Sequence, residues 1–374
     1  MLQQPVKFLL LVLVLASTAV APGCIAPKKY QPNKPFVFST TINIQGNLPP
    51  SEKQDLKSRL ENQLDDSLKT LLVTAYPGRI LLQHPPVFDT NSVHRSKEFM
   101  GSLLNSLGYY KAMVYDSVIR HPRSHKDQLR VSVVFYVYPG KGYKFDSIVY
   151  QLQDSALQSL AMARRANSLL KKGAPYSVDV ISEELDRLVD LFRNQGYYKF
   201  NKEDLLAERD TVFAALINPS LDPFERIALL QEAKRRQQNP AMNVLIKLRN
   251  PADSAHFRKY FIRNVTVYPD LDLLNDSTQV TPFRDSINGV AIYSKYNKFR
   301  PTFIESKMGV HPNDLFRQRN FLRTYSNYSQ LPAWAQVSIE TTEAKDSNAS
   351  ITTSLQRWRL GQAVECEIRQ YRHD

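Results

Sequence analysis

The tetrapeptide Gly-Tyr-Tyr-Lys occurs twice in this chain, at residues 108–111 and again at 196–199. Each copy follows a stretch whose apolar residues recur every three or four positions, which predicts an amphipathic helix. Each copy precedes a run that begins with aromatic residues and alternates like a strand. Because the same four residues recur between the same two patterns, we interpret the chain as tandem copies of one structural unit.

The glycine of each copy stands where the predicted helix ends. A glycine there can adopt the left-handed conformation that terminates a helix without the steric penalty of a side chain. We expect the tyrosines that follow to pack in the core and at a hinge rather than to contact a ligand. The predicted hinge residues are Gly108, Tyr109, Tyr110, Gly196, Tyr197 and Tyr198.

The predicted order of elements around the first copy is strand, helix, helix, strand, strand. The first strand begins at Phe36, and the last two strands cover residues 112–120 and 129–138. The order restarts at residue 144, with a predicted strand from Lys199 to Leu216 and a helical insertion near residues 222–238.

A third restart begins at residue 257. It includes a hairpin turn at Asn288-Gly289 and final strands at residues 335–340 and 351–355, while Tyr328-Ser329-Gln330-Leu331 stands in place of Gly-Tyr-Tyr. This third copy therefore depends on the order of elements alone.

Net charge narrows the classes of partner. Lys and Arg number 49 and Asp and Glu number 36 in 374 residues, so the formal net charge is +13. A basic chain can bind nucleic acid or anionic lipid, or can carry a solvated basic surface. The densest basic runs, at residues 171–172 and 234–236, are not interleaved with aromatic side chains as in an RNA-reading sheet. We therefore favour solvated helix faces and expect no nucleic-acid partner.

The amino terminus has the features of a secretory signal. Residues 1–23 contain a basic Lys7, a 14-residue apolar stretch from Phe8 to Ala21, and small residues immediately before Cys24. That stretch is shorter than the roughly 20 residues that span a bilayer. The pattern resembles a lipobox, which implies a lipid on Cys24 and a proline-containing tether over residues 24–35. A signal cleaved beside a chance cysteine is the alternative.

Motifs that would indicate catalysis are absent from the sequence. With only Cys24 and Cys366, the chain has no disulfide framework and no cysteine-rich metal site. It has no glycine-rich phosphate loop, HExxH motif or nucleophile elbow. The carboxylates at residues 65–66 and 183–184 are interpreted as solvated helix faces. We expect no catalytic residue, metal or cofactor, with a lipid-anchored hydrolase that has a cryptic site as an open alternative.

Three tandem units with Gly-Tyr-Tyr at the exit of the second helix resemble polypeptide-transport-associated (POTRA) domains, the periplasmic modules of BamA/TamA-type outer-membrane assembly proteins. The lipobox and the phrases at residues 196–200 and 331–335 are similar to the lipidated TamA-like branch, TamL. The resemblance implies an α+β fold in which each unit is a three-stranded mixed sheet with two helices on one face. It places POTRA-like units at residues 36–140, 141–251 and 252–356.

In that family the repeats precede a membrane-embedded barrel of sixteen strands. Only 19 residues follow Leu355, whereas a barrel needs many segments of about 10 alternating residues. We therefore expect residues 357–374 to be a truncated tail, and the chain to be a fragment or a member without a barrel.

The resemblance also implies that the second strand of each unit is a sheet edge, which can bind an extended partner by backbone pairing. The predicted edge residues are Ala112, Val114, Asp116 and Val118 in the first unit, and Lys199, Asn201, Glu203 and Leu205 in the second. Implied partners are unfolded outer-membrane proteins and periplasmic assembly partners, with the repeats in the periplasm and the lipid in the outer membrane. Two alternatives remain. The edges are covered by the neighbouring unit or blunted by charges such as Lys111, Lys202 and Asp204, or the repeats are a scaffold for a periplasm-spanning partner.

Overall fold

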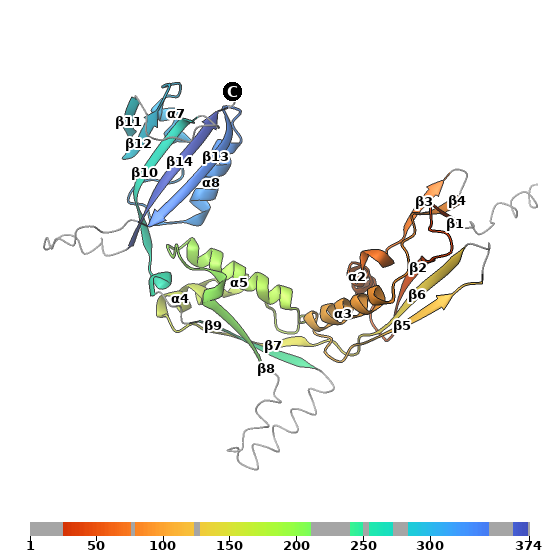
Figure 1. The fold of residues 1–374 in the computed structure, drawn as a ribbon. Helices are drawn as coiled ribbons and strands as arrows, with labels where there is room; N and C mark the ends of the chain where they lie inside the picture. Colours follow the sequence, from red (N-terminus) through yellow and green to blue (C-terminus); the bar gives the residue numbers. More distant parts are fainter. Residues whose placement is uncertain are drawn as a thin grey trace, which may run out of the picture. The chain divides into compact units, whose positions relative to one another are not determined.

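The structure is a computed structural model of the chain, shown in Figure 1. It describes residues 25–75, 79–122, 128–210, 240–249, 254–271, 283–343 and 362–372. These residues form two compact units, the first made of those up to Lys144 with Pro175–Val178 and Pro240, and the second made of the rest. Cys24, the predicted insertion at 222–238 and the predicted strand at 351–355 lie outside the described residues.

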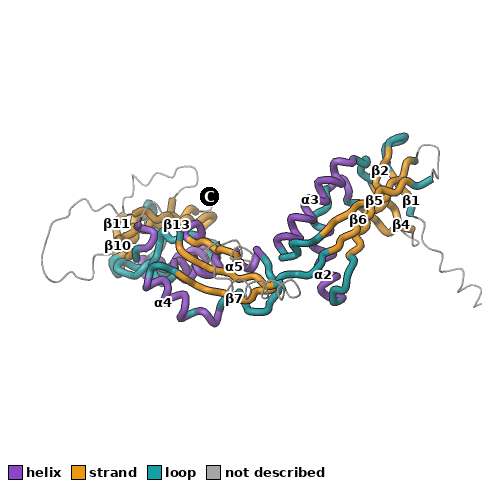
Figure 2. Tube along the Cα trace, turned by 90° about the horizontal axis from the view of Figure 1, so that it is seen from below, coloured by secondary structure: helices purple, strands orange, loops and turns teal. Residues whose placement is uncertain are grey.

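The first repeat follows the predicted order. Strand β2 (Pro35–Ile44) is followed by helices α2 (Pro50–Glu61) and α3 (Thr90–Ser106), then by strands β5 (Met113–Arg120) and β6 (Leu129–Tyr138). Strand β6 lies in the middle of the sheet, parallel to β2 and antiparallel to β5. The sheet is therefore three-stranded and mixed, as predicted (Figures 1 and 2).

One core fills the space between this sheet and its two helices. Alternate residues of β6 point into the core, and each helix adds an apolar stripe at helical spacing. The side chains at its centre are Leu56, Leu60, Met100, Leu104, Val131, Val133, Phe135 and Val137. Because only one face of the sheet is covered, the other face of β6 stays partly exposed.

Both glycines end their helices as predicted. Gly108 has φ of 81° after α3, and Gly196 has φ of 104° after α5 (Val178–Arg193). The next residue then donates its backbone N–H five residues back, from Tyr109 to the Leu104 carbonyl at 2.8 Å and from Tyr197 to the Phe192 carbonyl at 3.2 Å. This six-residue closure is the hydrogen bond of a Schellman motif, which requires the left-handed conformation that glycine adopts freely.

A small extra sheet in the first unit was not predicted. It has the order β1-β4-β3, built from Ala26–Lys28, Arg79–Gln83 and Leu71–Ala75. Strand β1 runs parallel to β4, so part of the segment predicted as a free tether is paired with the folded unit. Strands of three to five residues are too short for alternation to be read from the sequence, which explains the omission.

The second repeat contains β7 (Lys144–Gln151), α4 (Ser155–Ala163), α5, β8 (Leu205–Asp210) and β9 (Ala241–Leu248). Its sheet has the order β7-β9-β8, with β8 antiparallel to β9. The prediction that a strand begins at Lys199 is wrong, because residues 202–204 form a 3-10 helix and β8 starts only at Leu205. A capping box closes this turn, since Asn201 and Asp204 each accept a backbone N–H of the other's segment.

The third repeat has a larger sheet than predicted. Its strands are β10 (Tyr260–Leu271), β11 (Phe283–Ile287), β12 (Val290–Ser294), β13 (Trp334–Glu343) and β14 (Gln362–Arg372), in the order β11-β12-β10-β14-β13. Helices α7 (Pro301–Ser306) and α8 (Gln318–Ser329) precede β13. The hairpin predicted at Asn288-Gly289 is confirmed, since β11 and β12 pair there and both turn residues have positive φ.

Strand β14 corrects the prediction of a tail. Residues 362–372 pair parallel to β10 and antiparallel to β13, so this segment completes the third sheet. Among the described residues the α+β class is confirmed, with a three-stranded main sheet in each of the first two repeats and five strands in the third. Within the described part of the chain, every helix is too short or too polar to span a membrane.

Candidate functional site

Strand β5 forms one edge of the first sheet. It pairs with β6 from Met113 opposite Tyr138 to Arg120 opposite Val131. Among the strands that the structure describes, none pairs with the other side of β5. Its outer backbone groups are therefore oriented as those of an edge strand, which can accept an added strand.

The predicted edge residues lie on the face of β5 that meets the helices. Ala112, just before the strand, and Val114 pack against the core. The Asp116 Oδ1 atom accepts a hydrogen bond from Lys97 Nζ on α3 at 2.9 Å, and Val118 is partly exposed on the same face. Ala112, Val114 and Asp116 thus hold β5 to its helices, whereas Val118 is exposed near the end of the strand.

The opposite face of β5 carries an apolar patch that the sequence analysis did not select. Met113, Tyr115, Ile119 and the neighbouring Tyr138 of β6 are exposed by 53%, 52%, 44% and 43%. The Tyr115 and Tyr138 rings meet edge to face at 5.8 Å, and the Tyr115 hydroxyl donates to Met113 Sδ at 3.2 Å. We call these four residues the outer patch. Exposed apolar groups that are contiguous on one face mark contact surfaces in soluble proteins.

The edge of the second sheet is different. Of its predicted residues, only Leu205 lies in β8, and it is buried. Lys199 Nζ lies 2.8 Å from Glu343 Oε2, while Asn201 and Glu203 belong to the capped turn before the strand. On the exposed face of β8, Glu208 forms an ion pair with Lys247 of β9. Over its described residues, 205–210, this edge carries charged side chains and no exposed large apolar side chain.

The first Gly-Tyr-Tyr segment packs within the first unit. The Tyr109 hydroxyl donates to Glu52 Oε1 at 2.6 Å, and burial together with this carboxylate raises the pKa of Tyr109. The Tyr110 ring lies 5.1 Å from that of Tyr143 and 6.0 Å from that of Tyr176. The Gly108 carbonyl accepts the N–H of Tyr143 at 3.1 Å.

The second Gly-Tyr-Tyr segment makes the equivalent contacts in the second unit. Its glycine carbonyl accepts the N–H of Tyr260 at 2.9 Å. The Tyr198 ring lies 5.4 Å from the ring of Tyr260 and 4.9 Å from that of Phe316. The Tyr198 hydroxyl also lies 2.9 Å from Thr341 Oγ1 on β13 and donates to the Thr341 carbonyl at 3.2 Å.

The two arrangements share a further pair of backbone hydrogen bonds. Tyr176 donates its N–H to the Tyr143 carbonyl, and Phe316 donates its N–H to the Tyr260 carbonyl, both at 2.9 Å. Each of these donors stands two residues before a helix, α5 or α8. The duplicated tetrapeptide therefore fixes a duplicated set of hydrogen bonds to the chain that follows it. Whether this set acts as a hinge stays a prediction.

A buried polar network lies inside the second repeat, and the interpretation of Glu184 as solvated is wrong. The Glu184 carboxylate is fully buried and accepts hydrogen bonds from Arg187, from the Tyr150 hydroxyl at 2.6 Å and from the Leu169 N–H at 2.9 Å. Burial acts to raise its pKa, but the hydrogen bonds from Arg187 and Tyr150 outweigh burial and lower the pKa. Every acceptor oxygen thus has partners, which is typical of a structural network.

Among the residues that the structure describes, no three His, Cys, Asp or Glu side chains are grouped so that they could hold a metal ion. The β5 edge with its outer patch is the candidate binding surface that the topology and the exposed side chains support.

No protein-family model and no curated protein matches the chain. Solved structures similar to it include POTRA3-5 of BamA from Haemophilus influenzae, at 11% identity over 89% of this chain and 95% of that one, with a TM-score of 0.37. Another is POTRA1-3 of the periplasmic domain of Omp85 from Anabaena, at 11% identity over 91% and 96%, with a TM-score of 0.23. The N-terminal domain of Omp85 from Thermosynechococcus elongatus is similar at 10% identity over 90% and 97%, also with a TM-score of 0.23.

Proposed function

We propose that this chain is a periplasmic POTRA-type module of an outer-membrane protein assembly factor, of the TamA-like kind. In this proposal it holds unfolded outer-membrane polypeptides by adding them as an extra strand to β5. The sequence resemblance and the mixed three-stranded sheets support the class of protein. The observation that carries the binding site is the coincidence of the β5 edge with the outer patch.

Backbone pairing and side-chain contact would act together at this site. An edge strand supplies hydrogen bonds that do not depend on the partner's sequence, and the apolar face beside it favours partners with apolar residues at alternate positions. Unfolded barrel strands have this pattern, since apolar and polar residues alternate over segments of about 10 residues. The outer patch would therefore select such segments among extended chains.

Photo-crosslinking tests the proposal. A photoreactive residue at Tyr115 should trap unfolded outer-membrane polypeptides, whereas one at Thr41 should not. Thr41 is the matched control because it lies on the same face of the sheet, on the opposite edge strand β2, away from the outer patch. Trapping of a single stable partner at Tyr115 would favour a scaffold and contradict the proposal.

A peptide analogue separates strand addition from simple apolar contact. A 10-residue peptide with alternating apolar residues should bind the chain, and the same peptide N-methylated along one edge should bind at least tenfold more weakly, because it lacks the N–H donors of a strand. The Tyr115→Lys variant should bind the unmodified peptide more weakly, because lysine side chains on an edge strand discourage the addition of another strand. Equal binding of both peptides would rule out strand addition.

We also propose that a lipid on Cys24 anchors the chain to the outer membrane. The support is the signal-like sequence before this cysteine and its position directly after small residues. Acylation with more than one chain gives stable attachment, at about 0.8 kcal/mol per buried methylene. The Cys24→Ser variant should leave the membrane fraction, and a mature variant that stays attached would contradict the lipid.

A further inference from the structure

A polar pocket of about 490 Å³ lies in the second repeat, between β7 and the chain that follows α4. Its volume falls within the range of roughly 300–1,000 Å³ that is typical of ligand sites. One wall comes from residues within 146–150 of β7, and the other comes from residues within 165–172. All of these residues belong to the second compact unit, so a single folded unit forms the pocket.

Two cationic side chains of the pocket are hydrogen-bonded to its own wall. Arg165 Nη2 donates to the Ile148 carbonyl at 3.1 Å, and Lys171 Nζ donates to the Ala166 carbonyl at 3.3 Å. The Arg165 guanidinium also lies 6.0 Å from the centre of the Tyr150 ring. Because both acceptors are neutral carbonyls, these hydrogen bonds hold the charged ends at the pocket without neutralising them.

A third cation in the lining is Lys172, whose Nζ lies 3.0 Å from Asp146 Oδ1. Asp146 is the only carboxylate among the described residues of the lining. Glu184 contacts the lining through the hydroxyl of Tyr150, but Arg187 balances its charge. Three cations and one carboxylate thus give the lining a net charge of +2. A pocket with an excess of positive charge concentrates anions.

The charge of the lining restricts the chemistry of the anion. A phosphate monoester carries a charge of about −1.5 to −2 at pH 7 and three strong acceptor oxygens, which match the net charge and the three cations. A carboxylate or a phosphate diester carries one negative charge and would leave the pocket positive. Since a water molecule occupies about 30 Å³, the pocket is larger than the five heavy atoms of inorganic phosphate require.

We propose that this pocket binds a phosphate monoester, with Arg165, Lys171 and Lys172 as the donors to its oxygens. The recognised chemistry is the same for a soluble ester and for the headgroup of a lipid. The pocket lies in the second compact unit and the β5 edge in the first, so this proposal does not depend on the proposed function.

A soluble probe tests the site directly. Glycerol 3-phosphate would be titrated into the full chain and followed by calorimetry, and it should bind saturably and more weakly as the salt concentration rises. Dimethyl phosphate, a diester with one negative charge, should bind about tenfold more weakly, because it lacks the second charge and an acceptor oxygen.

Variants then assign the contacts. Arg165→Met should weaken glycerol 3-phosphate about tenfold, because a charge-assisted hydrogen bond is lost. Arg164→Met is the matched control, since Arg164 is the adjacent exposed arginine but lies outside the lining, and it should leave the affinity unchanged. Asp146→Asn raises the net charge of the lining and should strengthen binding, a gain that a damaged fold would not produce.

Vesicles distinguish the two sources of the ester. The Cys24→Ser chain, which cannot carry a lipid on that cysteine, would be mixed with phosphatidylcholine vesicles that contain or lack phosphatidic acid, whose headgroup is a phosphate monoester. Binding that requires phosphatidic acid and is lost in Arg165→Met would identify a lipid headgroup, and binding of glycerol 3-phosphate alone would identify a soluble ester. If neither binds, or if Arg165→Met weakens binding no more than Arg164→Met, the proposal is wrong.

Discussion

The first Gly-Tyr-Tyr-Lys segment leads directly into β5, whose outer face is apolar and exposed, whereas the second leads into a capped 3-10 turn before β8. The backbone bonds of the two segments correspond, but Lys111 is exposed while Lys199 forms an ion pair with Glu343. The tetrapeptide therefore specifies how a helix ends and how the following chain is held. The residues after it decide whether the next strand is an open edge.

The two repeats also differ in the polar residue that is buried at the equivalent position of the second helix. Ser96 and Glu184 each lie twelve residues before their glycine, and both are fully buried. Ser96 Oγ accepts the N–H of Asp65 at 2.9 Å, and Glu184 Oε2 accepts the N–H of Leu169 at the same distance. A neutral hydroxyl and a carboxylate thus each accept a backbone N–H at the equivalent position. The buried carboxylate also accepts hydrogen bonds from Arg187 and Tyr150.

Truncating these two residues should give the largest difference between the repeats. Glu184→Ala leaves Arg187 and Tyr150 without their acceptor and should destabilise the second repeat by about 3–5 kcal/mol. Ser96→Ala leaves only one buried N–H unsatisfied and should destabilise the first repeat by about 1–3 kcal/mol. Hydrogen exchange at the amides of β9 and β6 reports each repeat separately, and the unmutated repeat is the internal control. Equal losses would show that the charge at Glu184 is unimportant.

Acidification should destabilise the repeats less than truncation does, and it should destabilise the second repeat more than the first. The folded-state pKa of Glu184 is lowered, so its contribution to stability is present above the unfolded pKa of about 4.3 and is lost as pH falls through the folded pKa. In the first repeat Arg95 lowers the pKa of Asp65, but this pair is at the surface and contributes less. Exchange at β9 between pH 6 and 3 measures the effect, and Glu184→Gln should remove it. A pH dependence that survives in Glu184→Gln would contradict this account.

Substitution of the two glycines should give the next largest difference in stability between the repeats. Gly196→Ala places a methyl group 2.7 Å from Leu315 Cδ1 at a φ of 104°, and Gly108→Ala places one 2.9 Å from Tyr176 Cδ1 at 81°. The left-handed conformation alone disfavours alanine by about 1–2 kcal/mol. We expect Gly196→Ala to be the more destabilising, because its contact is closer and its φ is further from the left-handed helical value of about 57°. Thermal unfolding of both variants checks this order, and a milder Gly196→Ala would reverse it.

Local features were the predictable part of this fold. The helix-ending glycines and the Asn288-Gly289 turn follow from backbone sterics, which act within a few residues. Strand β14 could not be predicted, because it pairs with β10 about a hundred residues earlier in the chain. The burial of Glu184 also depends on partners elsewhere in the chain, Tyr150 and Leu169.

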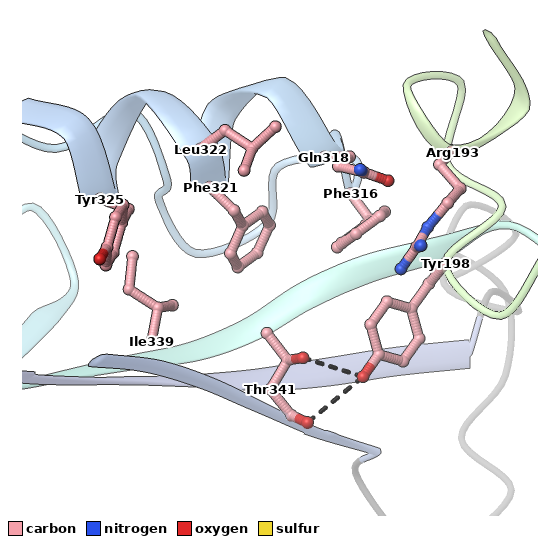
Figure 3. Close-up of a pocket in the computed structure, with 9 residues that line it drawn as sticks. All are labelled: Arg193, Tyr198, Phe316, Gln318, Phe321, Leu322, Tyr325, Ile339 and Thr341. Atoms are coloured by element: carbon pink, nitrogen blue, oxygen red, sulfur yellow. Dashed lines mark hydrogen bonds between the residues drawn. The ribbon is translucent and has the colours of Figure 1, made fainter. Parts of the chain in front are cut away.

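The outer patch could not be predicted for a related reason. Alternation along β5 divides its residues into two sets but does not say which set meets the helices. The outward set, with Met113, Tyr115 and Ile119, is the more apolar one, whereas Asp116 faces α3 because Lys97 pairs with it. A pocket between α8 and β13 (Figure 3) also depends on non-local packing, since its lining residues Arg193 and Gln318 are far apart in sequence.

Replacing the first tyrosine of each tetrapeptide by phenylalanine should give the smallest difference in stability between the repeats. Tyr109→Phe removes a hydroxyl that donates to Glu52, and should destabilise the first repeat by about 1 kcal/mol because the carboxylate is partly solvated. Tyr197 is also buried, and its pKa is raised by burial first and then by the charge of Asp154. Its ring packs on that of Phe192 at 6.4 Å. Tyr197→Phe keeps that ring and should change stability by less than about 0.5 kcal/mol. Exchange at β6 and β9 would measure both, and a larger loss in Tyr197→Phe would mean that the second hydroxyl, not the first, holds its repeat together.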